Sequence, residues 1–523
     1  MSLATKSTRN SKIEKLLLLG TWVVFLVLAL RTFGPDSVYT NYSSDSAIPV
    51  LMANDDRKIS VFDTYYYAAD RWGGWPMVIG KAVHLNTGFV WTDQRVHYTR
   101  TIWLFLGLLA LAALNGRAAP AVIVSGLIVI CLEHTSRRLA FDLSQLYSWQ
   151  VPALFIAWVC ARRVLTQPSR IFWSVAFYCS ALLAIWSSVA SAPLLTVVIT
   201  LEALRSHFLI PRTINKRRIA IAVVLLLAAT ASEYLMKLNY HRFSFKRFGH
   251  KYNTSMVLDF GYLHQNLLAN WDNIVQYHFF PFIVVAICFF AGTVGLMLYA
   301  LVTRRRSLAS RFFEDESATM IVVLTAMAAT NFALITSINH VRTSFYDVRF
   351  HTPTYLFAAI SGLLVIYLVI RVLAERLDVT RYAIPIVVAG AFVILAINFP
   401  PRVLSEVYKL EHETALTLSQ KAPRSVLMGR YWQTYLFAGL QPTNTMTPLP
   451  VEGELNRMPW TEDILDNSQQ VVVEYRKSEL LDDELLPPRE FRQYENLLRL
   501  KDAHFYENGP YAFALYINAG KTP

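Results

Sequence analysis

The sequence predicts a polytopic α-helical membrane protein of about eleven transmembrane helices with a small α/β extracytoplasmic C-terminal domain. Of the 523 residues, 54% are hydrophobic and only 16% are charged, with a mean hydropathy of +0.34. A soluble chain carries roughly 25% charged residues. The net charge is +12, yet the residues from 398 onward hold 13 basic and 17 acidic side chains. We therefore expect a basic membrane module over 1–398 and a soluble domain over 399–523, and exclude both an ordinary cytosolic enzyme and an acidic disordered protein.

Apolar runs of spanning length define the expected helices, since a membrane span needs about 17 to 25 residues. The first run follows four basic residues, as in a signal peptide, but it lacks a small-x-small cleavage site and Arg31 closes it. We therefore expect a retained first helix. The eleven expected spans are 14–33, 98–114, 118–133, 147–161, 171–188, 191–206, 217–239, 276–302, 317–338, 352–372 and 381–398.

The positions of basic residues predict the orientation of these spans. If the N-terminus is cytoplasmic, the inside segments hold twenty Lys and Arg residues and the alternation holds at every loop. The odd number of spans then places the C-terminal domain outside. Because the positive charge lies between spans, where it sets orientation, nucleic-acid binding is not predicted.

Three expected external loops, 34–97, 240–275 and 339–351, are longer than helix connections require. The first mixes aromatic and charged residues, which suits helices lying in the headgroup layer; simple interfacial anchoring is the alternative role of its aromatic residues. In the C-terminal domain, 469–476 and 511–518 are rich in β-branched and aromatic residues and predict strands, whereas 484–500 carries helix formers. These patterns predict a small α/β domain.

Acidic residues of the first loop are candidates for acid–base chemistry. Asp45 follows the first span by about a dozen residues, and Asp55 and Asp56 come ten residues later. A carboxylate near the hydrocarbon boundary is partly desolvated, which raises its pKa and makes it a better general base near neutral pH. The alternative for Asp45 is that it caps a helix beginning at Ser46 or Ala47.

External cations are candidates for binding a lipid phosphate or pyrophosphate through charge-assisted hydrogen bonds. The positive-inside rule disfavours them in short outer loops, so they need another reason to be there. Generic attraction to anionic membrane lipids is the alternative. Glu202, Glu233 and Lys237 lie near helix ends, where snorkelling explains them. The candidate cationic residues of the site are Arg137, Arg138, His340, Arg342, Arg349 and His351.

No HExxH, CxxC pair, P-loop or GxSxG motif occurs in a supporting context, so a metalloprotease, kinase or serine hydrolase is not predicted. Since cations alone can hold a lipid monophosphate, no cofactor is required, and a divalent metal is compatible with the site without being needed.

Three short motifs stand out in the sequence: Ser44-Asp45-Ser46-Ala47, Asp347-Val-Arg-Phe-His-Thr-Pro353 and Gly429-Arg-Tyr-Trp432. They resemble motifs of the GT-C superfamily of integral-membrane glycosyltransferases. The first occupies the position of the family's acidic motif, and the second is similar to its Arg-Tyr-x-x-Pro element, with Arg349 at its Arg. The third is similar to the start of external domains in bacterial members. The resemblance implies a polyprenyl-phosphate sugar donor, a glycan, lipid or protein acceptor, and Asp45 as the general base. We expect the protein to lie in the bacterial inner (plasma) membrane. The pair Asp55 and Asp56 remains the alternative source of the base.

Two other functions stay open at this point. A transporter or flippase of lipid-linked saccharide should show repeated halves and broken helices at the membrane midplane, whereas the unusual polarity here lies in the external loops. An O-antigen-type polymerase or ligase would also use external Arg and His on a lipid pyrophosphate. The interpretation that we favour is the one that the resemblance implies, which is inverting sugar transfer to an acceptor hydroxyl on the outer face.

Overall fold

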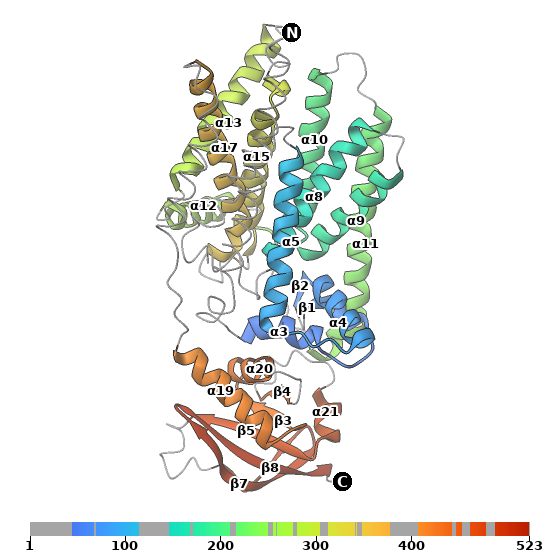
Figure 1. Ribbon diagram of the computed structural model, residues 1–523, viewed down its shortest axis with the longest axis vertical. Helices are drawn as coiled ribbons and strands as arrows, with labels where there is room; N and C mark the ends of the chain where they lie inside the picture. Colours follow the sequence, from blue (N-terminus) through green and yellow to red (C-terminus); the bar gives the residue numbers. More distant parts are fainter. Residues whose placement is uncertain are drawn as a thin grey trace, which may run out of the picture.

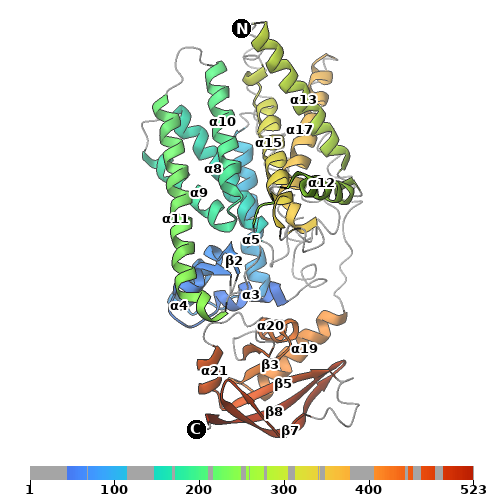
Figure 2. The same cartoon turned by 180° about the vertical axis from the view of Figure 1, so that it is seen from behind.

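The computed structural model places a bundle of long helices at one end of the molecule and a domain with a β-sheet at the other, with short elements between them (Figures 1 and 2). The structure describes residues 44–66, 69–114, 146–167, 171–209, 216–248, 255–257, 259–275, 280–303, 312–339, 341, 348–376, 406–441, 446–451, 461–476 and 487–521.

Eight long helices of the described ranges coincide with eight of the eleven apolar runs. The runs 14–33, 118–133 and 381–398 lie outside the described residues. The eight helices are α5 (Asp93–Leu114), α8 (Tyr147–Thr166), α9 (Ile171–Ser187), α10 (Ser191–Leu209), α11 (Lys216–Phe248), α13 (Phe280–Val302), α15 (Glu316–Thr336) and α17 (Thr352–Arg376).

Five of these helices, α5, α11, α13, α15 and α17, contain stretches long and apolar enough to cross a membrane. A stretch of about 20 apolar residues matches the thickness of the hydrocarbon core. The chain is therefore an integral membrane protein.

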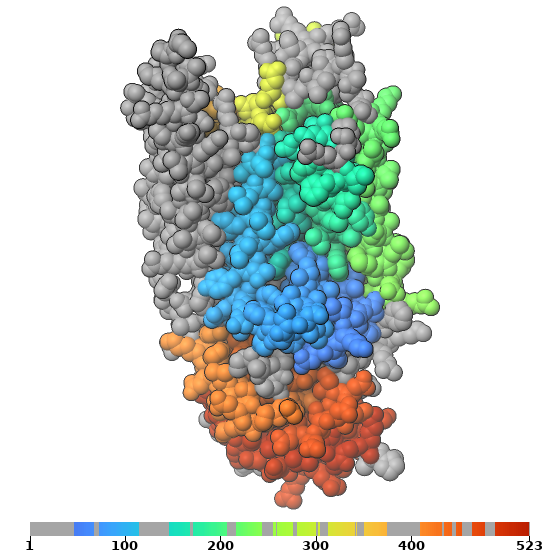
Figure 3. All heavy atoms as spheres, turned by 45° about the vertical axis from the view of Figure 1, so that its right-hand side comes forward, coloured from blue at the N-terminus to red at the C-terminus, as the bar shows by residue number. Residues whose placement is uncertain are grey.

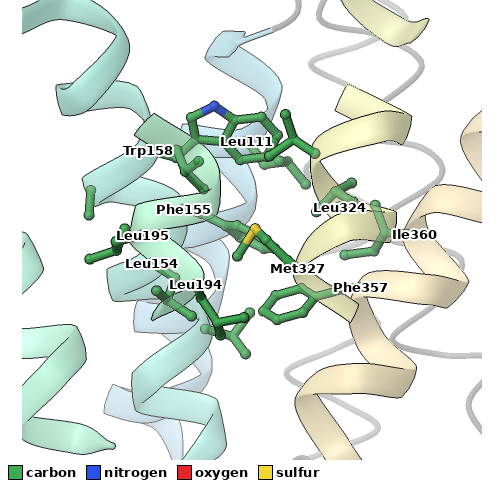
Figure 4. Close-up of a cluster of buried hydrophobic side chains, with 14 of the residues drawn as sticks. Leu111, Leu154, Phe155, Trp158, Leu194, Leu195, Leu324, Met327, Phe357 and Ile360 are labelled. Atoms are coloured by element: carbon green, nitrogen blue, oxygen red, sulfur yellow. The ribbon is translucent and has the colours of Figure 1, made fainter. Parts of the chain in front are cut away.

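The helices pack in two groups that meet in one apolar core (Figure 4). Phe155 of α8 lies against Phe357 of α17, with ring centroids 6.0 Å apart. Within the first group, α5 and α8 approach closely where Gly107 faces Pro152. A Cβ on Gly107 would lie only 2.4 Å from the Pro152 Cα, so the contact requires glycine.

The first loop folds into short elements beside the ends of α5, α9 and α11. These are α3 (Ser44–Ala53), η1 (Val61–Thr64), the antiparallel pair β1 (Tyr65–Tyr66) and β2 (Ala69–Gly73), and α4 (Trp75–Thr87). Helix α4 ends at Gly88, whose φ of +67° gives a left-handed cap that glycine adopts without strain. Two further short elements, α12 (Phe260–Val275) and η2 (Val348–His351), fall in the other two long loops.

The C-terminal sheet has the strand order β4-β3-β5-β8-β7-β6. Strands β4, β3 and β5 run parallel, and the remaining neighbours pair antiparallel. The elements are α19 (Glu406–Lys421), β3 (Val426–Gly429), α20 (Tyr431–Gly439), β4 (Thr447–Pro450), α21 (Thr461–Asn467), β5 (Gln470–Arg476), β6 (Glu490–Gln493), β7 (Asn496–Asn508) and β8 (Tyr511–Lys521).

The expected helix over 484–500 is wrong for its described part, 487–500. Strands β6 and β7 form a hairpin there, and the two turn residues Tyr494 and Glu495 have φ values of 46° and 65°. Positive φ at both central positions is the geometry of a type I′ turn, which matches the twist of paired strands. Pairing with β8 and burial of Leu498 outweigh the helix propensity of this segment.

Candidate functional site

Asp45 lies on α3, which is held between the helix bundle and the C-terminal domain. Ala47 and Val50 belong to an apolar cluster with residues of the C-terminal domain, whereas Ile48 and Leu51 share a cluster with Trp149 of α8. Figure 3 shows the first-loop segment directly against the C-terminal domain. Asp45 is the second residue of α3, within its first turn. The expectation that it caps a helix beginning at Ser46 or Ala47 is therefore wrong.

A buried lysine organises the loop that follows α3. Lys81 of α4 is only 1% exposed, and its Nζ donates to Asp55 Oδ2 at 2.7 Å and to Asp63 Oδ1 at 2.8 Å. Arg57 Nε donates to the other oxygen of Asp55 at 2.8 Å. Two carboxylates and two cations thus balance, which fixes Asp55 in one orientation.

Local sequence features bring these charges together. Ser60 and Asp63 form a reciprocal capping box at the start of η1, which orients Asp63. The Asn54 side-chain amide donates from Nδ2 to the Trp91 carbonyl and accepts at Oδ1 from the Trp91 backbone N–H. Trp91 Nε1 donates to the Gly80 carbonyl. Lys81 is not among the residues expected from the sequence, although a single lysine within the apolar run Trp75–Leu85 was an available signal.

The adjacent acids Asp55 and Asp56 face different surroundings. The Asp56 side chain is 87% exposed, and His84 Nε2 lies 2.8 Å from its Oδ1. The Asp55 side chain is 9% exposed and occupied by Lys81 and Arg57. Asp56 can therefore reach a ligand from solvent, whereas Asp55 is part of the folded loop.

The first loop is also tied to α11. Tyr65 donates from its hydroxyl to Glu233 Oε1 at 2.9 Å, and its ring lies 5.0 Å from that of Tyr240. Glu233 is buried, so snorkelling does not explain it. The same correction applies to Glu202, whose carboxylate is buried against Trp158 and Arg162 at the other end of the bundle.

His351 is the one candidate in the 339–351 loop whose side chain the structure describes. It is fully buried in η2, next to the rings of Phe332 and Tyr355 at 5.0 and 6.2 Å. Within the described part of the chain, neither ring nitrogen has a hydrogen-bond partner. Burial lowers the pKa of His351 to about 3, so the imidazole is neutral at physiological pH.

Of the remaining candidate cations, the structure describes the backbone of Arg349 alone. Arg349 lies in η2, next to buried Phe350, and its backbone is described. Arg137, Arg138, His340 and Arg342 lie outside the described residues.

Helix α5 supplies two polar residues that the sequence analysis missed. His97 and Arg100 are buried on the first turns of α5, with Arg100 fully enclosed. An arginine within an expected span was an available signal, because such a residue rarely faces lipid. Arg100 is, after Lys81, a second buried basic residue at the end of the bundle that carries the first loop.

The described side chains include no group of three or more His, Cys, Asp or Glu positioned to hold a metal ion. At Asp55 and Asp63, the Lys81 ammonium occupies the place between the two carboxylates. Lys81 and Arg57 therefore balance the carboxylates of Asp55 and Asp63.

No protein-family model and no curated relative matches the sequence. Among solved structures, ArnT from Cupriavidus metallidurans in the apo state matches with a TM-score of 0.53 at 12% identity, covering 97% of this chain and 99% of that chain. An Archaeoglobus fulgidus oligosaccharyltransferase tethered with an acceptor peptide matches with a TM-score of 0.47 at 12% identity, covering 88% of this chain and 69% of that chain. The similarity to ArnT extends over nearly the whole of both chains. The chain therefore has the fold of ArnT.

Proposed function

We propose that this protein transfers a sugar from a polyprenyl-phosphate-linked donor to an acceptor hydroxyl at the outer face of the membrane, with inversion. The observation that carries the proposal is the position of α3, which brings the Asp45 backbone to the junction of helix bundle, first loop and C-terminal domain. The GT-C fold supports the reaction class. The acceptor is a glycan, lipid or protein.

In the proposed reaction, the Asp45 carboxylate accepts the proton of the acceptor hydroxyl as its oxygen attacks the anomeric carbon. The bond from that carbon to the phosphate oxygen breaks, and the lipid phosphate leaves with the electron pair. Attack opposite the leaving group inverts the anomeric configuration. Asp45 ends the step protonated and returns the proton to solvent.

Cations stabilise the phosphate charge that develops on the leaving group. We assign this role to Arg349, with Arg137, Arg138 and Arg342 as further contacts. Asp56, exposed beside His84, is suited to accept hydrogen bonds from sugar hydroxyls. Asp55 positions the loop through Lys81, and neutral His351 supports η2 next to Arg349. A divalent metal is compatible with this chemistry and is not required by it.

We propose the bacterial inner (plasma) membrane as the location, with the N-terminus in the cytoplasm and the C-terminal domain outside. This orientation follows from the twenty inside cations.

A reconstituted transfer assay tests the function. The full chain is placed in liposomes with a radiolabelled polyprenyl-phosphate sugar and an extract of envelope acceptors. We expect label in a new glycoside together with release of the free lipid phosphate. Movement of intact donor between leaflets, without cleavage, would replace the enzyme with a transporter. Dependence on a lipid-pyrophosphate donor would favour an O-antigen-type ligase.

A further inference from the structure

The last turns of α5, α8 and α10 and the first turn of α15 lie at the end of the helix bundle opposite the first loop (Figure 1). Side chains of these turns line a cavity of about 360 Å³ that is partly open to the surface. Ligand pockets typically have about 300 to 1,000 Å³. Because the 22 residues of α5 separate it from the first loop by roughly 30 Å, this cavity is distinct from the proposed transfer site.

Four charged side chains form a closed ring in the cavity wall. Arg162 donates from Nε and Nη2 to Glu202 Oε1 at 2.9 and 2.7 Å, and from Nη1 to Glu316 Oε2 at 2.6 Å. Arg205 donates from Nη2 to Glu316 Oε1 at 2.6 Å, and its Nη1 lies 3.6 Å from Glu202 Oε2. The ring is electrically neutral and joins α8 and α10 to α15.

Two further cations around the cavity are not neutralised in this way. Arg163 also lines it, and its guanidinium lies over the Trp173 ring at 5.8 Å. Arg218 of α11 donates to the carbonyl oxygens of Leu165 and Thr166, two residues of the cavity wall. Within the described ranges, neither Arg163 nor Arg218 has a carboxylate partner. The cavity therefore carries an excess of positive charge.

The apolar wall of the cavity and its position at the ends of the helices favour a lipid ligand. Leu114, Val159 and Leu165 supply apolar surface beside the arginines. The cavity lies at the ends of membrane-spanning helices, which is the level of the headgroup layer, where basic residues meet anionic lipids.

We propose that this cavity binds the phosphate of an anionic phospholipid from the leaflet on that side, with Arg163 as its main contact. The phosphate neutralises the excess charge while the acyl chains leave along the apolar wall. Since the neighbouring ring joins α15 to α8 and α10, the bound lipid stabilises the contact between the two helix groups. The inference concerns a structural lipid and does not depend on the proposed transfer reaction.

The test measures bound lipid on the full chain. Wild-type protein is equilibrated in nanodiscs containing equal amounts of phosphatidylglycerol and phosphatidylcholine, released, and weighed by native mass spectrometry. We expect one retained phosphatidylglycerol. Because a hydrogen bond to a charged group contributes enough for about a tenfold change in binding, Arg163→Gln should retain at least tenfold less. Arg163→Lys should retain an intermediate amount, since the positive charge remains.

Arg217→Gln is the matched control. Arg217 is an exposed cation in the first turn of α11, next to Arg218, and it does not line the cavity. It should retain the lipid as the wild type does. Equal losses in Arg163→Gln and Arg217→Gln, or equal wild-type retention of both phospholipids, would overturn the site. In detergent, phosphatidylglycerol should raise the unfolding midpoint and inorganic phosphate should not. An equal rise with inorganic phosphate would identify a free-phosphate site and overturn the lipid assignment. The wild-type arms decide the question even if a variant fails to fold.

Discussion

The Tyr65 hydroxyl donates to Glu233 Oε1 at 2.9 Å, joining the first loop to a helix 168 residues further along the chain. Both side chains are buried, so the bond ties β1 to α11. On the other side of the loop, α3 packs against both α8 and the C-terminal domain. The segment that carries Asp45 and Asp55 is thus anchored at both of its ends, which is the preorganisation that general-base catalysis requires.

The first prediction concerns Lys81. Replacing it by Met leaves Asp55 and Asp63 close together in a buried site without their shared cation. Breaking a buried ion pair by removing one partner costs about 3 to 5 kcal/mol, so Lys81→Met should unfold at a clearly lower temperature in detergent. His84→Ala removes the pair with exposed Asp56 and should change stability by less than about 1 kcal/mol. Equal melting temperatures for Lys81→Met and wild type would show that Lys81 does not hold the loop.

The second prediction concerns pH and His351. Burial lowers its folded-state pKa to about 3, below its ordinary value of 6.5. Between these values the unfolded chain binds more protons than the folded chain. The contribution of neutral His351 to the free energy of unfolding is therefore fully present above pH 6.5. It declines as the pH falls toward 3, by up to about 1.4 kcal/mol per pH unit. His351→Phe removes the titrating group, so its unfolding midpoint should fall less steeply between pH 6 and 4. Identical slopes for the two proteins would contradict this assignment.

The helices that the sequence predicted well are those that correspond to long apolar runs. The runs 147–161 and 352–372 reappear as α8 and α17 because spanning helices satisfy their own backbone and need only length and hydropathy. Tyr511–Asn518 reappears within β8. The helix expected over 484–500 was wrong because strand pairing in the β6-β7 hairpin and between β7 and β8 decides the conformation there, and helix propensity does not contain this pairing.

The candidate site was predicted only in part, for a related reason. Acids in the first loop could be found from composition, but a lysine in an apolar helix and a glutamate on α11 acquire partners only through the fold. Lys81 reaches back 26 and 18 residues to Asp55 and Asp63. Glu202 joins Arg162 across 40 residues. Spacing along one helix gives no sign of either contact.

The third prediction concerns Arg349. As the proposed contact of the leaving phosphate, its replacement by Ala should weaken donor binding and turnover more than tenfold, because a charge-assisted hydrogen bond contributes roughly 1.5 to 3 kcal/mol. Arg349→Lys should recover only part, since an ammonium cannot make a planar two-point contact. Isothermal titration with a polyprenyl phosphate measures the affinity. Unchanged affinity in a folded Arg349→Ala protein would remove this residue from the site.

The fourth prediction concerns topology. The inside cations predict that a reporter fused after Arg306 is cytoplasmic and that one fused after Asn518 is external. Paired alkaline phosphatase and fluorescent protein fusions report the two sides. If both positions score on the same side, the eleven-span topology fails and the transfer site loses its outward orientation.

The last prediction is that Asp45 is the general base, and it separates three carboxylates of one loop. Asn at position 45 keeps the size of the side chain and part of its hydrogen-bonding capacity, but it cannot accept a proton at neutral pH. Since loss of a general base typically costs 10²- to 10⁴-fold in rate, Asp45→Asn should fold, bind the donor lipid and turn over at least a hundredfold more slowly.

Asp56→Asn keeps hydrogen-bonding capacity at an exposed position, so it should affect apparent acceptor affinity more than turnover. Asp55→Asn weakens the pair with Lys81, so its loss of activity should follow its loss of thermal stability. Near-normal turnover in Asp45→Asn, with an inactive but stably folded Asp55→Asn or Asp56→Asn, would move the catalytic role to that pair. Activity in all three variants would leave the proposed transfer without its base and would favour the transporter.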